Sequence, residues 1–142
     1  MCLDTAVSLE TEQEGLGYKC FNVRGEQQLL TMLHNFPVER GEWISNPRPN
    51  TDIGYRPRAV YRSGFHILKN RHEAYLYLAR EWGFQNRPWR IQEVFTSPFA
   101  ILPVKYKQAH TQGGQYGYEV VVADELYILT EEELREFQRD II

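Results

Sequence analysis

The residues with the clearest potential for chemistry lie in the short segment 61–66, which reads YRSGFH. A histidine beside a glycine turn could act as a general base or orient a ligand. An arginine close to it suits a phosphate or a carboxylate. Tyr61, Arg62 and His66 are therefore weak candidates for catalytic residues, although no Ser-His-Asp order can be argued. The alternative is that His66 is a core or boundary histidine that is hydrogen-bonded to backbone.

Metal and phosphate motifs are not apparent elsewhere. The four histidines form no His-x-x-x-His pair, and the two cysteines form no Cys-x-x-Cys pair, so a structural zinc site is not expected. The glycines of the segment GGQYG, residues 113–117, could suggest a phosphate loop, but such a loop needs a following helix. A strand is expected there instead, which favours a hairpin loop. The sequence predicts neither a metal site nor a cofactor.

A basic segment surrounds the candidate cluster. Between Asp52 and Glu73 there are five basic residues and no acidic one, with Tyr55, Tyr61 and Phe65 interleaved. This pattern could contact phosphates and bases, or it could pair with the acidic C-terminal part of the same fold. The isoelectric point near 5.8 argues against a dedicated DNA-binding protein. The predicted binding residues are Trp43, Tyr55, Arg56, Arg58, Tyr61 and Arg62.

Charge is sorted along the chain although the net charge is only −3. Residues 1–14 hold four acidic residues and no Lys or Arg, and residues 119–142 hold eight acidic residues against two arginines. Residues 15–118 hold 14 basic and seven acidic residues. Acidic segments at both ends could imitate nucleic acid toward a basic partner.

Local patterns predict the elements that must position these residues. Strands are expected at 17–23, 28–34, 38–44, 65–68, 90–95, 99–106 and 118–129. One helix should begin after the N-cap Asn70, run to about Trp82 and end at Gly83. A second should begin at Thr130, with Glu133 at the reciprocal capping position, and run to the end. Residues 1–14 are expected to be a polar, frayed lead, and residues 108–117 a flexible connection. Residues 35–57 are irregular and rich in proline, as binding loops often are.

These elements predict one α+β domain over residues 1–142, with a mostly antiparallel sheet meander of five to seven strands and two helices. No apolar run approaches the roughly 20 residues of a membrane helix, and the N-terminus lacks the basic start of a secretory signal. A cytoplasmic location is therefore expected, in which Cys2 and Cys20 would both be free thiols. Cys20 lies in an apolar stretch and is expected in the core.

The order of several short motifs resembles a known group of proteins. GYKCFNV comes first, then YRSGFHIL followed by a helix with HEAYLYL, then GGQYG and VVVADELYIL. Over residues 17–129 this resembles a family of small uncharacterised proteins found in phages, prophages and bacteria. The resemblance implies a setting in which small acidic proteins bind and redirect or block a host protein. It carries over no activity and no catalytic residue.

Three functions follow as hypotheses. The first is a phage-type accessory protein, located in the host cytoplasm, that inhibits or modulates a bacterial host protein such as a component of a defence system. The second is a protein or enzyme, ADP-ribosyl-like in one form, that binds a nucleotide-like ligand through the segment Tyr61–His66. The third is nucleic-acid binding through residues 55–72. An exposed aromatic edge would also be compatible with a homodimer.

Overall fold

The computed structural model describes residues 3–24, 28–31, 36–49, 51–54, 59–82, 94–96 and 99–141. These residues form mostly antiparallel strands with two helices, so the expected α+β class is confirmed. The elements along the chain are β1 (Thr5–Arg24), β2 (Gln28–Thr31), β3 (Pro37–Val38), β4 (Trp43–Ser45), β5 (Asp52–Gly54), β6 (Val60–Arg62), β7 (Phe65–Leu68), α1 (Arg71–Trp82), β8 (Val94–Thr96), β9 (Phe99–Gln115), β10 (Tyr118–Ile128) and α2 (Glu131–Ile141).

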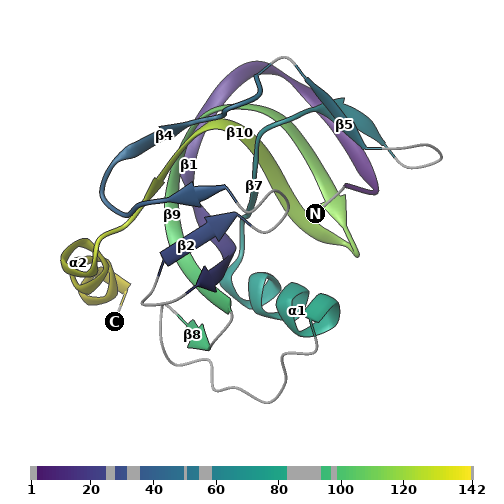
Figure 1. Cartoon of the computed structure of the whole chain (residues 1–142). Coiled ribbons are helices and arrows are strands. Elements are labelled where there is room, and N and C mark those ends of the chain that lie inside the picture. Colours follow the sequence, from purple (N-terminus) through teal and green to yellow (C-terminus); the bar gives the residue numbers. More distant parts are fainter. Residues whose placement is uncertain are drawn as a thin grey trace.

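The main sheet closes on itself. Its strand order β3-β2-β1-β7-β10-β9-β8 consists of two three-stranded meanders joined by β7. In addition β1 pairs with β9 along most of its length, so that β1, β7, β10 and β9 form a hydrogen-bonded ring. The three long strands bend together around this ring (Figure 1). Closure at β7 depends on a single pair, Tyr18 with Leu68.

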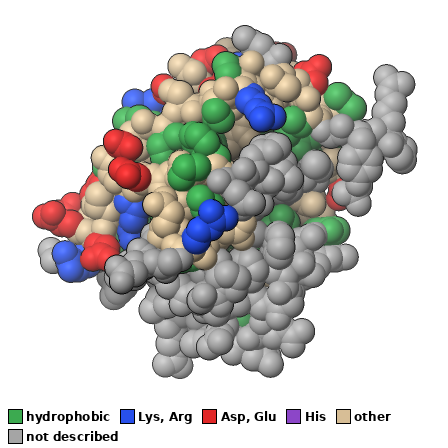
Figure 2. All heavy atoms as spheres, viewed as in Figure 1, with side chains coloured by type: hydrophobic (Ala, Val, Ile, Leu, Met, Phe, Trp, Pro, Cys, Tyr) green, Lys and Arg blue, Asp and Glu red, His purple; other side chains and the backbone are tan. Residues whose placement is uncertain are grey.

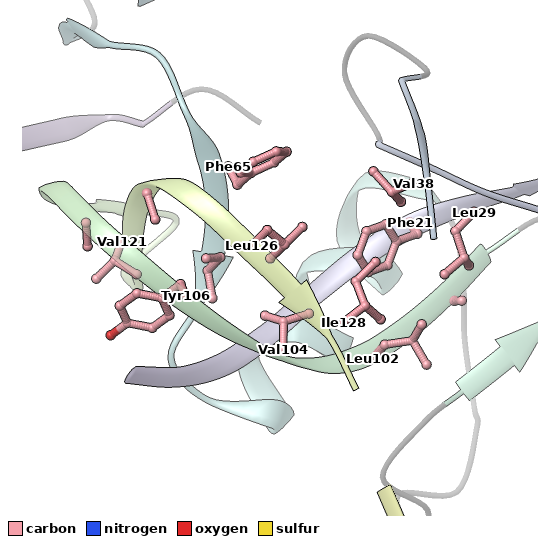
Figure 3. Close-up of a cluster of buried hydrophobic side chains, with 14 residues drawn as sticks. Phe21, Leu29, Val38, Phe65, Leu102, Val104, Tyr106, Val121, Leu126 and Ile128 are labelled. Atoms are coloured by element: carbon pink, nitrogen blue, oxygen red, sulfur yellow. The ribbon is translucent and has the colours of Figure 1, made fainter. Parts of the chain in front are cut away.

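Alternation of side chains along these strands divides the buried residues into two clusters. The first lies inside the curve of the ring (Figure 3) and includes Phe21, Phe65 and Val104. The second lies on the other face, under α1, and includes Leu68 and Leu78. Because both faces are covered, all four residues of β7 are buried, as expected for a continuous apolar run.

The two helices begin where their capping residues predict. The side chain of Asn70 accepts a hydrogen bond from the backbone N–H of Glu73, with a distance of 3.1 Å. At α2, the hydroxyl of Thr130 accepts from the N–H of Glu133 at 3.2 Å, while the Glu133 carboxylate accepts from the N–H of Thr130 at 3.3 Å. This is the reciprocal capping box expected from the sequence. The expected end of the first helix, Gly83, lies outside the described residues.

Two segments expected to be irregular are strands along nearly their whole length, and the irregular stretch 35–57 also contains the unpredicted strand β5. Residues 5–14, predicted to be a frayed lead, extend β1, and residues 108–115, predicted to be a flexible connection, extend β9. The two extensions pair with each other, from Thr5 opposite Gly114 onward. A Cβ atom at Gly113 would collide with the carbonyl oxygen of Thr5. The glycines therefore allow two backbones to approach closely, and only Tyr116 and Gly117 form the turn, both with positive φ.

Candidate functional site

His66 and Tyr61 face each other from β7 and β6. The His66 Nε2 atom lies 2.7 Å from the Tyr61 hydroxyl, and Nδ1 lies 3.1 Å from the carbonyl oxygen of Gly64. A carbonyl oxygen can only accept, so Nδ1 carries the proton and Nε2 accepts from the tyrosine. The Tyr61 oxygen in turn accepts from the backbone N–H of Leu3 at 2.9 Å. Both side chains are thus satisfied within the fold.

The environment of His66 keeps its imidazole neutral. Burial lowers the pKa of His66 well below its ordinary value, and the positive charge of Lys19 lowers that pKa further. Its Nε2 lone pair is already used by Tyr61, so His66 is not free to act as a general base. The structure therefore brings two of the three weak catalytic candidates together, in the arrangement of a histidine bonded to backbone.

Arg62, the third candidate, points to a different partner. Its guanidinium forms an ion pair with Asp124 of β10. The Asp124 carboxylate also accepts from the side-chain amide of Asn46 at 3.1 Å and lies 3.5 Å from the Nε2 atom of His110. An arginine that is already paired with a carboxylate contributes little positive charge to a surface that would bind nucleic-acid phosphates. In the view of Figure 2, coloured basic and acidic side chains are interspersed rather than gathered by sign.

A β-bulge aims His110 at this cluster. On β10 the residues Val122 and Ala123 are consecutive, but their partners on β9 are Thr111 and Ala109. His110 is the extra residue, and bulges of this kind redirect a side chain. Its Nε2–H donates to the carbonyl oxygen of Ser63 at 3.1 Å. Burial lowers the pKa of His110, although the nearby Asp124 carboxylate acts in the opposite direction.

The same cluster fixes the segment that follows β4. The backbone N–H of Asn46 donates to the carbonyl oxygen of Asp124 at 2.7 Å, and its side chain donates to that of Ser63 at 3.3 Å. The Ser63 hydroxyl donates to the carbonyl oxygen of Arg48 at 2.7 Å. Residues 46–48 are therefore held against Ser63, just before β7, and against Asp124 of β10, and they form one wall of a pocket.

This pocket, here called the Lys19 pocket, has a volume of about 600 Å³. It lies where β1 and β7 part. β1 pairs with β7 only at Tyr18, opposite Leu68, and from Phe21 onward β1 pairs with β2 instead. In the same way, β10 pairs with β7 up to Ala123 and with β4 from Glu125 onward. The ring is thus interrupted, and the described lining residues are Lys19, Cys20, Thr31, Phe36, Pro37, Asn46, Pro47, Arg48, Thr51, Asp52, Ile53, Ser63, Gly64, Phe65, His66 and Tyr77.

Lys19 is the unusual residue of the pocket. Its side chain is buried, and its Nζ atom donates to the carbonyl oxygen of His66 at 2.9 Å. That carbonyl lies beyond the last β1–β7 pair, so the lysine reaches across the gap between the strands. Burial lowers the pKa of Lys19 to about 8. Among the described residues no carboxylate forms an ion pair with it.

Cys20, the next residue, also lines the pocket, although its side chain belongs to the buried cluster under α1. Its thiol donates to the carbonyl oxygen of Ala74 in α1 at 3.5 Å, and burial raises its pKa to about 12. A thiol with such a pKa is an inert part of the core at neutral pH. The expectation that Cys20 is a core residue is confirmed.

Trp43, another predicted binding residue, does not line the pocket. Trp43 is 41% exposed, its ring centroid is 5.4 Å from that of Tyr127, and the Nζ atom of Lys107 lies 4.2 Å from its centroid. Tyr55, Arg56 and Arg58 lie outside the described residues. Tyr61 and Arg62 do not line the pocket, whereas Gly64 and His66 do.

Lys19, Asp124 and His110 were not singled out from the sequence. Asp124 could have been found, because Asp124 and Glu125 interrupt the apolar run VVVADELYIL, and neighbouring residues of a strand face opposite sides, so one of the two carboxylates needs a partner if both faces are covered. Lys19 had only a weak signal, since a lysine between apolar residues usually lies on the exposed face of a strand. His110 had none, because its position depends on the bulge.

Neither metal-ligand clusters among the described residues nor similarity to known proteins assigns a function to this chain. Within the described ranges, no three His, Cys, Asp or Glu side chains are grouped so as to hold a metal ion. Of the helices described, none has the length and apolar character to cross a membrane. Comparison with protein-family models, curated proteins and solved structures found no match. The resemblance to phage and prophage proteins therefore stays a prediction.

Proposed function

We propose that the chain binds a small organic molecule that carries one anionic group, a carboxylate, on a mainly apolar body. The observation that supports this proposal is the buried ammonium of Lys19 in a pocket of about 600 Å³, with no ion-pair partner among the described residues. Buried charges in proteins are normally paired, because an isolated ion loses its hydration. A bound carboxylate would supply the missing counter-ion.

The pKa of Lys19 indicates that the ammonium is poorly stabilised in the unliganded protein. Its pKa is lowered from 10.5 to about 8, mainly by burial. A carboxylate beside the Nζ atom would favour the charged form and raise the pKa again. The free energy of binding would therefore include this stabilisation of the buried ammonium.

The rest of the lining favours a single charge over a polyphosphate. The described charged residues are Lys19, Arg48 and Asp52, which sum to one positive charge while His66 is neutral. Phosphate groups usually require several cationic or backbone donors. The remaining surface is largely apolar, with contributions from Phe36, Pro37, Pro47, Ile53, Phe65 and Tyr77. A nucleotide is therefore a less suitable ligand than a carboxylate with an apolar or aromatic body.

Thermal unfolding and calorimetry with matched probes test this proposal. Octanoate and phenylacetate should raise the melting temperature, whereas their neutral amides should raise it much less, because only the acids supply a counter-ion. The Lys19→Met variant should lose this difference between acid and amide. Lys69→Met is the matched control, because the Lys69 Nζ atom is 3.4 Å from the Tyr106 hydroxyl, and Lys69 does not line the pocket.

Two results would contradict the proposal. One is that neither acid binds the wild-type protein more tightly than its amide. The other is that Lys19→Met binds the acids as tightly as the wild type does. AMP serves as a further probe, and a stronger stabilisation by AMP than by the acids would favour the nucleotide-binding hypothesis instead.

Binding to a bacterial host protein is a second candidate, supported by one observation. Trp43 is a large aromatic side chain that is 41% exposed on the short strand β4. Tryptophan is enriched among the residues that dominate protein interfaces. A tagged protein should retain the same host protein from bacterial lysate with and without nuclease, and Trp43→Ala should release it. Retention that does not depend on Trp43 would contradict this use of the surface.

A further inference from the structure

We propose that Lys19 also reacts with a small aldehyde or ketone in the Lys19 pocket and holds it as a reversible imine. This step rests on the proposed function, since the carbonyl compound must occupy the same pocket. It differs from anion binding because it needs the neutral amine rather than the ammonium. The chain would then capture carbonyl compounds covalently, in addition to binding carboxylates.

The geometry leaves the Lys19 nitrogen available for reaction. One acceptor, the His66 carbonyl oxygen at 2.9 Å, fixes the position of the Nζ atom, and both residues line the pocket. No other hydrogen bond holds this nitrogen within the described part of the chain, and the residue itself lines the pocket. A carbonyl carbon that enters the pocket can therefore approach an amine whose position is already set.

Burial supplies the reactive protonation state. With a pKa of about 8, roughly a quarter of the Lys19 side chains are neutral at about pH 7.5, compared with about one in a thousand for an ordinary lysine. Desolvation in a mainly apolar pocket is one of the established ways of activating a lysine as a nucleophile. Cys20 also lines the pocket but does not compete, because its thiol donates to the Ala74 carbonyl oxygen and its pKa is raised to about 12.

The reaction balances without a co-reactant. The lone pair of the neutral amine forms a C–N bond to the carbonyl carbon, while the C=O π electrons move to oxygen. Transfer of a proton from nitrogen to oxygen gives a carbinolamine. A second proton transfer from nitrogen to the hydroxyl group releases water as the C–O bond breaks and the C=N bond forms. Phe36, Phe65 and Tyr77 contribute to the pocket lining, and aromatic side chains around an imine disfavour its hydrolysis.

Reductive trapping tests this inference. The folded protein is incubated with benzaldehyde and sodium cyanoborohydride at about pH 7.5, and peptide mass spectrometry measures the initial rate of alkylation at each of the four lysines. Alkylation at Lys19 should be about tenfold faster than at Lys69, Lys105 and Lys107, and this preference should disappear in urea. The rate at Lys19 should rise with pH around a midpoint near 8.

The same samples separate the two proposals. Phenylacetate should compete with benzaldehyde and slow the alkylation of Lys19 alone. Phenylacetate binding in the calorimeter without preferential alkylation of Lys19 would overturn the imine and leave the anion site intact. Preferential alkylation without phenylacetate binding would overturn the anion site and support the imine. An absence of both would overturn both proposals.

Discussion

Replacing Lys19 by methionine should stabilise the protein at neutral pH, which is unusual for a buried residue. Methionine retains much of the apolar stem and removes the charge. The shift of the lysine pKa from 10.5 to about 8 corresponds to about 3 kcal/mol against the folded state at pH 7. The variant also loses the hydrogen bond to the His66 carbonyl oxygen, which offsets about 1–2 kcal/mol. A net gain of about 1–2 kcal/mol in the free energy of unfolding is expected.

The dependence on pH makes this prediction specific to the charge. Between pH 8 and 10.5 the unfolded state binds more protons at Lys19 than the folded state does, so wild-type stability gains from this group as pH rises. The unfavourable contribution is complete below the folded pKa and disappears above the unfolded one. The advantage of Lys19→Met should therefore shrink by about 2–3 kcal/mol between pH 7 and pH 10, and its sign should change.

Urea unfolding followed by tryptophan fluorescence, at both pH values, measures this difference. Lys69→Met is the control for the general effect of removing one positive charge. A stability difference between wild type and Lys19→Met that is the same at both pH values would refute the reasoning, because it would show that the ammonium is not destabilised by burial. So would a loss of more than about 2 kcal/mol in the variant at pH 7.

Three further changes test other parts of the structure. Asp124→Ala should lower the free energy of unfolding by about 1–3 kcal/mol, because the buried His110 and the partly buried Asn46 and Arg62 lose their shared acceptor; a loss below about 0.5 kcal/mol in urea unfolding would contradict this. Gly113→Ala should lower the melting temperature clearly, whereas Gly114→Ala, with no contact shorter than 3.5 Å for the added Cβ, should change it little; equal effects would be inconsistent with the close strand approach. Stability should fall as pH drops below about 6.5, because burial lowers the pKa of His66 and His110 and the unfolded state then binds more protons; a flat profile from pH 7 to pH 5 would oppose it.

The parts of the fold that depend on local chemistry could be predicted. Asn70 and Thr130 mark the helix starts because their side chains bond to backbone a few residues away. The short apolar run of β7 was likewise recognisable without knowledge of its neighbours. In contrast, residues 5–14 alternate only briefly, at Val7-Ser8-Leu9-Glu10, before a polar stretch, and the whole length is a strand because β9 pairs with it. When two paired segments lie this far apart in the sequence, the residues of either segment alone do not show that the pairing will form.

The candidate site was less predictable for the same reason. The sequence singled out Tyr61 and His66 as neighbours, together with the alternative that His66 is a core or boundary histidine bonded to backbone, and the structure has that backbone bond. Lys19 was missed because the burial of a lysine on β1 depends on the closure of the ring and on the gap beside β7. Sequence alternation assigns a face to a residue, but it does not say whether that face is covered.

The long pairing of β1 with β9 has a consequence for how the protein is made. Asn22 pairs with Phe99 and Thr5 with Gly114, so roughly 80–110 residues separate the partners. At ordinary rates of translation, β1 is synthesised roughly 4–20 seconds before its partner strand β9. During that time its backbone groups and the apolar side chains of residues 16–23 have no native partner in β9. The nascent chain should therefore depend on chaperones more than its modest length would suggest.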